Sequence, residues 1–153
     1  ERLQKYNYNN NYTYGHGDYD SNTVQVLFFE YKSYIDQVFK TEKISEVSNL
    51  IVLGYSQGVS IATRWLASRK INCEHLVLHS GGIPKELTKE DFKYMPTNTI
   101  VTFLYGTNDK YINEARINEE ELKGNNLFGE RLNIQIFEGV HEVNKEFLLE
   151  LSK

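Results

Sequence analysis

A short apolar run that enters a glycine-flanked serine constrains this chain more than any other feature. Residues 50–53 read Leu-Ile-Val-Leu, and residues 54–58 read Gly-Tyr-Ser-Gln-Gly. The apolar run predicts a strand, and the apolar residues after the second glycine recur at helical spacing. A serine on such a turn must take strained backbone angles, and the flanking glycines lack the Cβ atoms that would collide as strand and helix approach.

This geometry would lift the Ser56 hydroxyl above the sheet, where a helix N-terminus points its N–H groups. An oxyanion formed there would meet backbone donors, beginning with the N–H of Gln57. The alternative is an ordinary strand-to-helix turn with a solvated serine. The order of the elements that follow decides which of the two interpretations is favoured.

Chain length and composition indicate one soluble globular domain. The chain has 153 residues, of which 25% are charged and eleven are tyrosines. This length is enough to bury a real core, and the composition is not that of a disordered chain. We see no apolar run near the roughly eighteen residues that a membrane span needs. We also see no signal-peptide pattern at the start.

Charge and cysteine usage limit the partners and the compartment. The net charge is −4, and lysine and arginine are scattered along the chain, so nucleic acid is not an expected partner. Cys73 is the single cysteine, which excludes an internal disulfide, and its place just before an expected strand favours a buried thiol. A reducing compartment fits, and we expect a cytoplasmic protein.

The N-terminal segment differs from the rest of the chain. Residues 1–22 are rich in tyrosine, asparagine and glycine, which predicts a long loop, either a mobile tail or a loop over the mouth of the active site. Residues 23–39 carry apolar side chains three and four apart and predict an amphipathic helix capped by Ser21 or Asn22. We therefore expect a folded domain over residues 23–153.

Strands and helices then alternate to the end of the chain. Strands are expected over residues 50–53, 75–80, 99–105 and 132–137. Helices are expected over residues 57–70, as a solvated helix over 113–127, and over 142–151, the last burying Val143, Phe147, Leu148 and Leu151. This alternation predicts a three-layer α/β sandwich, a mainly parallel sheet with helices on both faces.

Three polar residues each follow an expected strand by a few residues: Ser56, Asp109 and His141. Loops at the carboxyl ends of parallel strands converge on one crevice, so these side chains can meet there. A serine hydroxyl needs a base, a neutral imidazole is the usual base near pH 7, and a carboxylate fixes the imidazole tautomer. The order Ser, Asp, His is that of an α/β-hydrolase.

Other residues compete for two of these roles. Glu114 is a second candidate acid, and Asp109 could instead cap a turn. His75 and His79 are alternative bases, but one opens a strand and the other ends one, without a flexible loop to bring it over Ser56. We interpret both as structural histidines.

The chain resembles the phospholipase/carboxylesterase branch of α/β-hydrolases, which includes acyl-protein thioesterases and lysophospholipases. The resemblance spans residue 50 to the C-terminus and rests on residues 54–58, on Gly-Thr-Asn-Asp at 106–109 and on Gly-Val-His-Glu at 139–142. It implies Ser56 as nucleophile, His141 as general base, Asp109 as orienting acid and the Gln57 N–H as an oxyanion donor. It also implies a small-molecule ester or thioester substrate, with no cofactor or metal.

The chain departs from this branch at its N-terminus. Members begin with several strands and a His-Gly loop that gives the second oxyanion N–H, whereas the only His-Gly pair here, residues 16–17, follows no apolar strand. We therefore expect an N-terminally incomplete fold with an exposed edge at residues 50–53, through which the chain could form a homodimer. Losing one oxyanion donor would lower turnover by roughly a hundred- to a thousandfold.

The expected function is hydrolysis of carboxylic esters or thioesters through an acyl-enzyme. A vestigial, non-catalytic interaction or structural module of the same fold is the alternative from another class. A peptidase or acyltransferase would use the same three side chains.

Overall fold

The computed structural model describes residues 21–46 and 49–151, and the chain divides into two compact units, residues 1–42 and 43–153. The first unit contains helix α2, Ser21–Thr41. This helix confirms the one expected over residues 23–39 and is two residues longer at each end. Ser21 and Asn22, which were expected to cap the helix, are the first two residues of α2. Of the long loop expected over residues 1–22, residues 21–22 are helical and residues 1–20 lie outside the described part of the chain.

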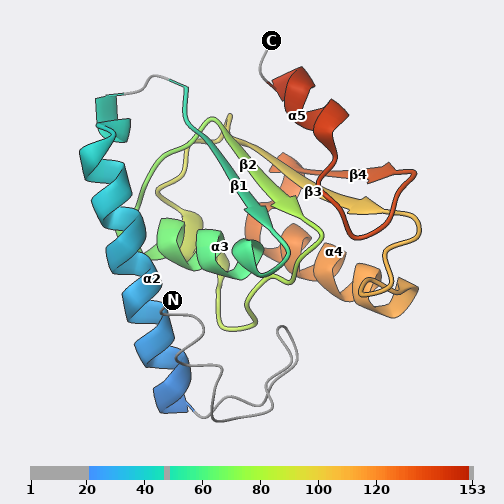
Figure 1. Cartoon of the computed structure of the whole chain (residues 1–153), viewed down its shortest axis with the longest axis horizontal. Coiled ribbons are helices and arrows are strands. Elements are labelled where there is room, and N and C mark those ends of the chain that lie inside the picture. The colour runs from blue at the N-terminus through green and yellow to red at the C-terminus, as the bar shows by residue number, and fades with distance from the viewer. Residues whose placement is uncertain (1–20, 47–48, 152–153) are drawn as a thin grey trace. The chain divides into compact units, whose positions relative to one another are not determined.

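The second unit is built on a parallel sheet. Its four strands pair in chain order (Figure 1): β1 Ile51–Tyr55, β2 His75–His79, β3 Ile100–Gly106 and β4 Leu132–Phe137. Every neighbouring pair is parallel. All four strands were expected from the apolar runs: the bounds of β4 match at both ends, and those of the other three differ by at most two residues.

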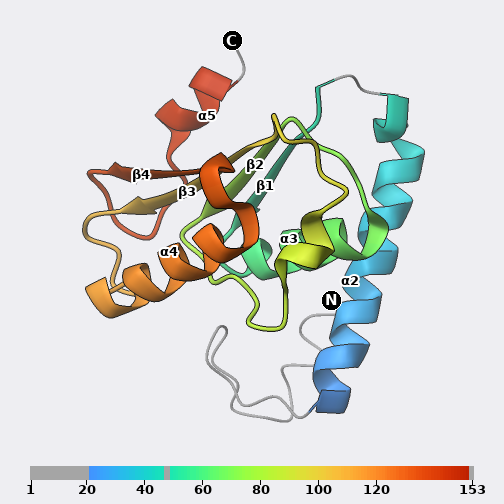
Figure 2. The ribbon, with the colours of Figure 1, turned by 180° about the vertical axis from the view of Figure 1, so that it is seen from behind.

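Helices cover both faces of this sheet, so the predicted three-layer α/β architecture is confirmed. Helices α3, Gln57–Arg69, and α4, Glu114–Phe128, lie on one side of the sheet, and α5, Lys145–Leu151, lies on the other (Figures 1 and 2). Three short 3-10 helices complete the described elements: Ile44–Glu46, Lys89–Phe92 and Gly129–Arg131.

The core follows from the alternation of side chains along the two central strands. Val77 and Leu104 pack with Phe147 of α5. Their strand neighbours point to the opposite face, because successive side chains of a strand alternate, and are fully or almost fully buried there: Leu76, Leu78, Val101 and Phe103. Burial on both faces explains why β2 and β3 read as continuous apolar runs rather than as alternating ones.

Two helices differ from expectation. The last helix begins at Lys145 and not at residue 142, because the side chain of Asn144 accepts the Phe147 N–H at 3.0 Å and caps it. Of the four residues expected to be buried by this helix, Phe147 is buried and the other three are half-buried. Helix α4 is not wholly solvated, since it buries one face: Glu120, Gly124, Leu127 and Phe128.

Candidate active site

Ser56 occupies a strained turn between β1 and α3. Its φ is 54° and its ψ is −118°, a region that side-chain-bearing residues rarely adopt. The Ser56 N–H donates to the carbonyl oxygen of His79 at 2.8 Å, which fixes the turn against the end of β2. The expectation of strained backbone angles at this serine is confirmed.

Close approach at the turn depends on one of the two flanking glycines. A Cβ on Gly54 would lie 2.6 Å from the carbonyl oxygen of Gly58, so a side chain there would push the strand from the helix. A Cβ on Gly58 itself would meet open space, and its expected steric role is wrong. The structure adds Gly81, whose Cβ would collide with the Ser56 carbonyl oxygen.

The structure brings Ser56, His141 and Asp109 into one hydrogen-bonded chain. His141 Nε2 lies 3.0 Å from Ser56 Oγ, and His141 Nδ1 lies 2.7 Å from Asp109 Oδ2. The Asp109 side chain is fully buried, whereas 19% of the His141 side chain is exposed. The imidazole therefore bridges a buried carboxylate and a hydroxyl.

Both carboxylate oxygens of Asp109 accept a hydrogen bond. Oδ2 accepts from His141, and Oδ1 accepts the Tyr111 N–H at 2.9 Å. Because a carboxylate can only accept, the proton of the imidazole sits on Nδ1, and Nε2 is left to accept from the Ser56 hydroxyl. This tautomer leaves the nitrogen beside the hydroxyl able to take a proton.

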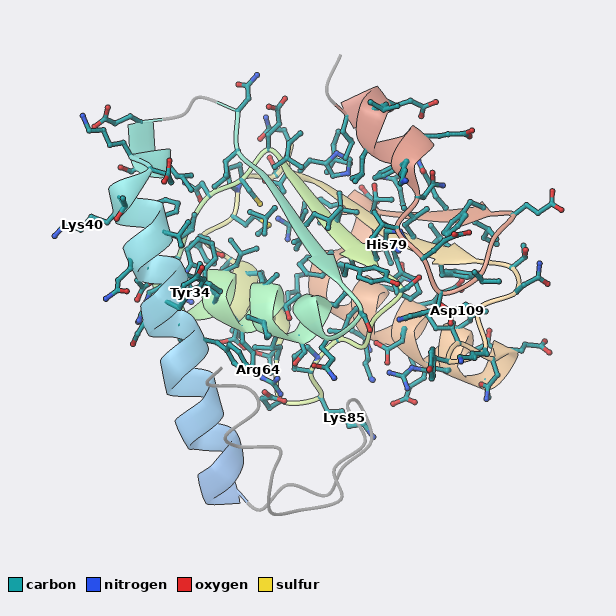
Figure 3. The ribbon with its side chains drawn as sticks, viewed as in Figure 1. Tyr34, Lys40, Arg64, His79, Lys85 and Asp109 are labelled. Carbon is teal, nitrogen blue, oxygen red and sulfur yellow. The ribbon has the colours of Figure 1, made fainter. Side chains whose placement is uncertain are left out.

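The loops after β3 and β4 are joined to each other. The Asn108 N–H donates to the Gly139 carbonyl oxygen at 2.8 Å, and the Thr107 N–H donates to the Phe137 carbonyl oxygen at 2.9 Å. A Cβ on Gly106 would lie 2.5 Å from the Gly139 carbonyl oxygen, so this approach needs glycine. Asp109 and His79 both lie toward the carboxyl ends of the strands (Figure 3).

The competing residues have other contacts. Glu114 is exposed at the start of α4. His75 Nε2 lies 2.8 Å from Thr102 Oγ1, and its ring stands edge-on to Phe147. His79 is fully buried; its Nε2 accepts the Asn144 N–H at 3.0 Å, and its Nδ1 lies 3.1 Å from Ser80 Oγ. Burial and the neighbouring His141 lower the pKa of His79 to about 4.

Two tyrosines around His141 were not anticipated from the sequence. The Tyr55 hydroxyl donates to the His141 carbonyl oxygen at 2.9 Å, and the Tyr111 ring stands edge-on to the imidazole with centroids 4.9 Å apart. Burial, with the negative charges of Asp109 and Glu142, raises the pKa of Tyr55. Tyr55 is the variable residue before the serine, so the motif itself gives no signal for this contact.

Gln57 is the first residue of α3 and directly follows Ser56. The N–H groups of a first helical turn have no intrahelical acceptor, so this one is available to an oxygen beside Ser56. Among the residues that the structure describes, no group of three or more His, Cys, Asp or Glu side chains is placed to hold a metal ion. No helix in residues 21–46 or 49–151 combines the length and hydropathy needed to cross a membrane.

Several solved structures share this fold at low sequence identity. A Bacillus cereus carboxylesterase is 20% identical with a TM-score of 0.57, over 92% of this chain and 64% of its own. Zea mays acyl-protein thioesterase 2 is 14% identical with a TM-score of 0.58, and the match covers 93% of this chain and 67% of the thioesterase. An Agrobacterium tumefaciens protein of unknown function is 17% identical with a TM-score of 0.60, over 92% and 65%. The chain thus spans about two thirds of the length of these proteins.

The curated protein sequences gave no match to this chain. A family model described as Phospholipase/Carboxylesterase matches residues 13–153, which is most of the chain and includes all three residues of the hydrogen-bonded chain. The resemblance found in the sequence is therefore confirmed, and the protein belongs to the phospholipase/carboxylesterase family of α/β-hydrolases.

Proposed function

We propose that the protein is a serine hydrolase that cleaves carboxylic esters or thioesters through an acyl-enzyme. The observation that carries this proposal is the continuous chain of hydrogen bonds Ser56–His141–Asp109, with separations of 3.0 and 2.7 Å. A nucleophile, a base and an orienting carboxylate within hydrogen-bond reach are what covalent acyl transfer requires. Membership of the phospholipase/carboxylesterase family supports the same chemistry.

In the proposed first step, Ser56 Oγ attacks the acyl carbon while His141 Nε2 takes the hydroxyl proton. The tetrahedral oxyanion accepts from the Gln57 N–H. As the intermediate collapses, the imidazolium returns its proton to the leaving alcohol or thiol. Asp109 holds the Nδ1–H of the ring and stabilises its positive charge throughout.

In the second step, water replaces the alcohol or thiol. His141 Nε2 takes a proton from the water, whose oxygen attacks the acyl carbon, and the same imidazolium then protonates Ser56 Oγ as the acid departs. The names of two structural neighbours, a carboxylesterase and an acyl-protein thioesterase, favour oxygen and sulfur esters as the substrates to try first.

The test is labelling by a fluorophosphonate probe, together with hydrolysis of a short p-nitrophenyl ester and of an acyl thioester. We expect the wild type to be labelled and to turn over, and Ser56→Ala to lose both. Ser60→Ala is the matched control, because Ser60 lies one turn further along α3 and bonds to Arg64. We expect it to keep labelling and turnover.

Two outcomes contradict the proposal. Labelling that persists in Ser56→Ala would place the nucleophile elsewhere. A folded wild type that neither labels nor hydrolyses either substrate would favour the non-catalytic interaction module instead.

A further inference from the structure

His79 lies at the meeting point of the segments that carry the nucleophile and the base. Its carbonyl oxygen accepts the Ser56 N–H at 2.8 Å, which anchors the turn after β1. Its side chain contacts the loop between β4 and α5, where Nε2 accepts the Asn144 N–H at 3.0 Å. One buried residue thus contacts both segments without touching the serine hydroxyl.

The ring of His79 contacts two aromatic rings and forms hydrogen bonds at both of its nitrogens. It stands edge-on to Tyr55, with centroids 5.1 Å apart, and edge-on to Phe137, with centroids 5.6 Å apart. Its Nδ1 lies 3.1 Å from Ser80 Oγ. With Nε2 accepting, the neutral ring carries its proton on Nδ1 and donates it to that hydroxyl. The position and tautomer of the ring are therefore set by its surroundings.

The loop held by this ring carries His141. Asn144 is three residues beyond His141, and it also caps α5 through the Phe147 N–H. On the other side of the loop, Tyr55, which packs on His79, donates its hydroxyl to the His141 carbonyl oxygen. The loop is thus held at two points: at the His141 carbonyl oxygen by Tyr55, which packs on His79, and at the Asn144 N–H by His79 itself.

We infer that His79 is a positioning residue, which holds the loop bearing His141 so that Nε2 of the base stays within reach of Ser56 Oγ. This inference rests on the proposed function for its effect on turnover, but the hydrogen bond itself is testable without turnover. His79 acts through the loop and not on the substrate. A misplacement of about 1 Å in a catalytic group can cost roughly a hundredfold in rate.

Two amide substitutions separate this role from simple filling of the core. In His79→Gln the amide oxygen reaches the place of Nε2 and can accept the Asn144 N–H. In His79→Asn the shorter amide reaches only the place of Nδ1, near Ser80. Both replace the ring with a polar group of similar chemistry, so they differ chiefly in the contact to the loop.

We expect kcat for a short p-nitrophenyl ester to fall about ten- to a hundredfold in His79→Asn, with KM changed less than about threefold. His79→Gln should recover most of the lost kcat. His75→Asn is the control, because His75 lies four residues earlier on the same face of β2 but its side chain hydrogen-bonds to Thr102. It should keep the wild-type kcat even where it lowers stability.

Nuclear magnetic resonance tests the same inference independently of activity. A scalar coupling through the hydrogen bond, between the Asn144 amide nitrogen and His79 Nε2, is expected in the wild type. The His141 Nδ1–H signal should shift or broaden in His79→Asn, and should stay in place in His79→Gln and His75→Asn.

Absence of the coupling in the wild type overturns the inference, and so does a His79→Asn variant with unchanged kcat and an unchanged His141 signal. If His79→Asn fails to fold, two measurements still test the inference: the coupling in the wild type must be present, and His79→Gln must keep most of the wild-type kcat. An inactive wild type with the coupling present would refute the proposed function and leave the positioning contact standing.

Discussion

The N–H of Asn108 donates to the carbonyl oxygen of Gly139 at 2.8 Å, so the turn that carries Asp109 and the loop that carries His141 share a backbone hydrogen bond. Asp109 and His141 follow these two residues by one and two positions. The distance of 2.7 Å between Asp109 Oδ2 and His141 Nδ1 is thus set largely by the backbone and does not depend on the side-chain contact alone. Gly106 makes this approach possible, since it has no Cβ.

We expect Gly106→Ala to disturb the contact between Asp109 and His141 more than it disturbs the fold. Its Cβ would lie 2.5 and 2.7 Å from the carbonyl oxygens of Gly139 and Val140, both backbone atoms that cannot rotate away. Displacement of this loop should lower kcat by about tenfold or more and stability by about 1–3 kcal/mol. Thr107→Ala is the control, because Thr107 is exposed and its backbone bond remains. A Gly106→Ala variant with wild-type kcat would show that the loop adapts.

Asp109→Asn tests which carboxylate orients the base. An amide can donate to Nδ1, which favours the tautomer with its proton on Nε2 and leaves no acceptor for the Ser56 hydroxyl. We expect kcat to fall by roughly ten-thousandfold with little change in KM. Glu114→Gln is the matched control, and its exposed position predicts less than about twofold change. A large loss in Glu114→Gln together with an active Asp109→Asn would reverse the assignment.

Much of this arrangement could be predicted from the sequence, because its causes are local. Buried parallel strands read as apolar runs, and a polar residue just after such a run lies at the carboxyl edge of the sheet. Ser56, Asp109 and His141 share that property. The strained φ at Ser56 was also predictable, since a sharp strand-to-helix turn at a serine leaves few backbone conformations.

The contacts that support the site could not be predicted, because they join residues distant in the chain. The Tyr55 hydroxyl meets a backbone carbonyl 86 residues away, and His79 meets a backbone N–H 65 residues away. Neither has a sequence pattern, since the acceptor or donor is main chain. The steric role expected of Gly58 was wrong because its missing Cβ points to open space, a direction that the motif does not encode.

Strand β1 is an edge of the sheet formed by the four described strands, and we expect it to support a homodimer. Ile51 and Leu53 on this strand are 40% and 36% exposed, an apolar edge of the kind that pairs with another chain. Leu53→Lys places a charge there and should shift a dimer to monomer in light scattering after size exclusion. Leu122→Lys, at a residue of helix α4 that is 63% exposed, is the control and should leave the dimer intact. A wild type that stays monomeric at high concentration would contradict this prediction.

The buried ring of His79 should make stability depend on pH. Burial lowers its pKa from 6.5 to about 4, so between these values the unfolded chain binds a proton that the folded chain does not. The contribution of the neutral His79 ring to the free energy of unfolding is therefore fully present above pH 6.5. It is lost as pH falls toward 4, by about 3 kcal/mol in total. The pKa of His75 is lowered as well, but His75 is retained in a His79→Gln variant, so the difference between the two proteins isolates His79. Urea unfolding at pH 7.5, 5.5 and 4.5 should show a shallower decline in His79→Gln than in the wild type, whereas parallel declines would mean that the ring is charged or accessible in the folded protein.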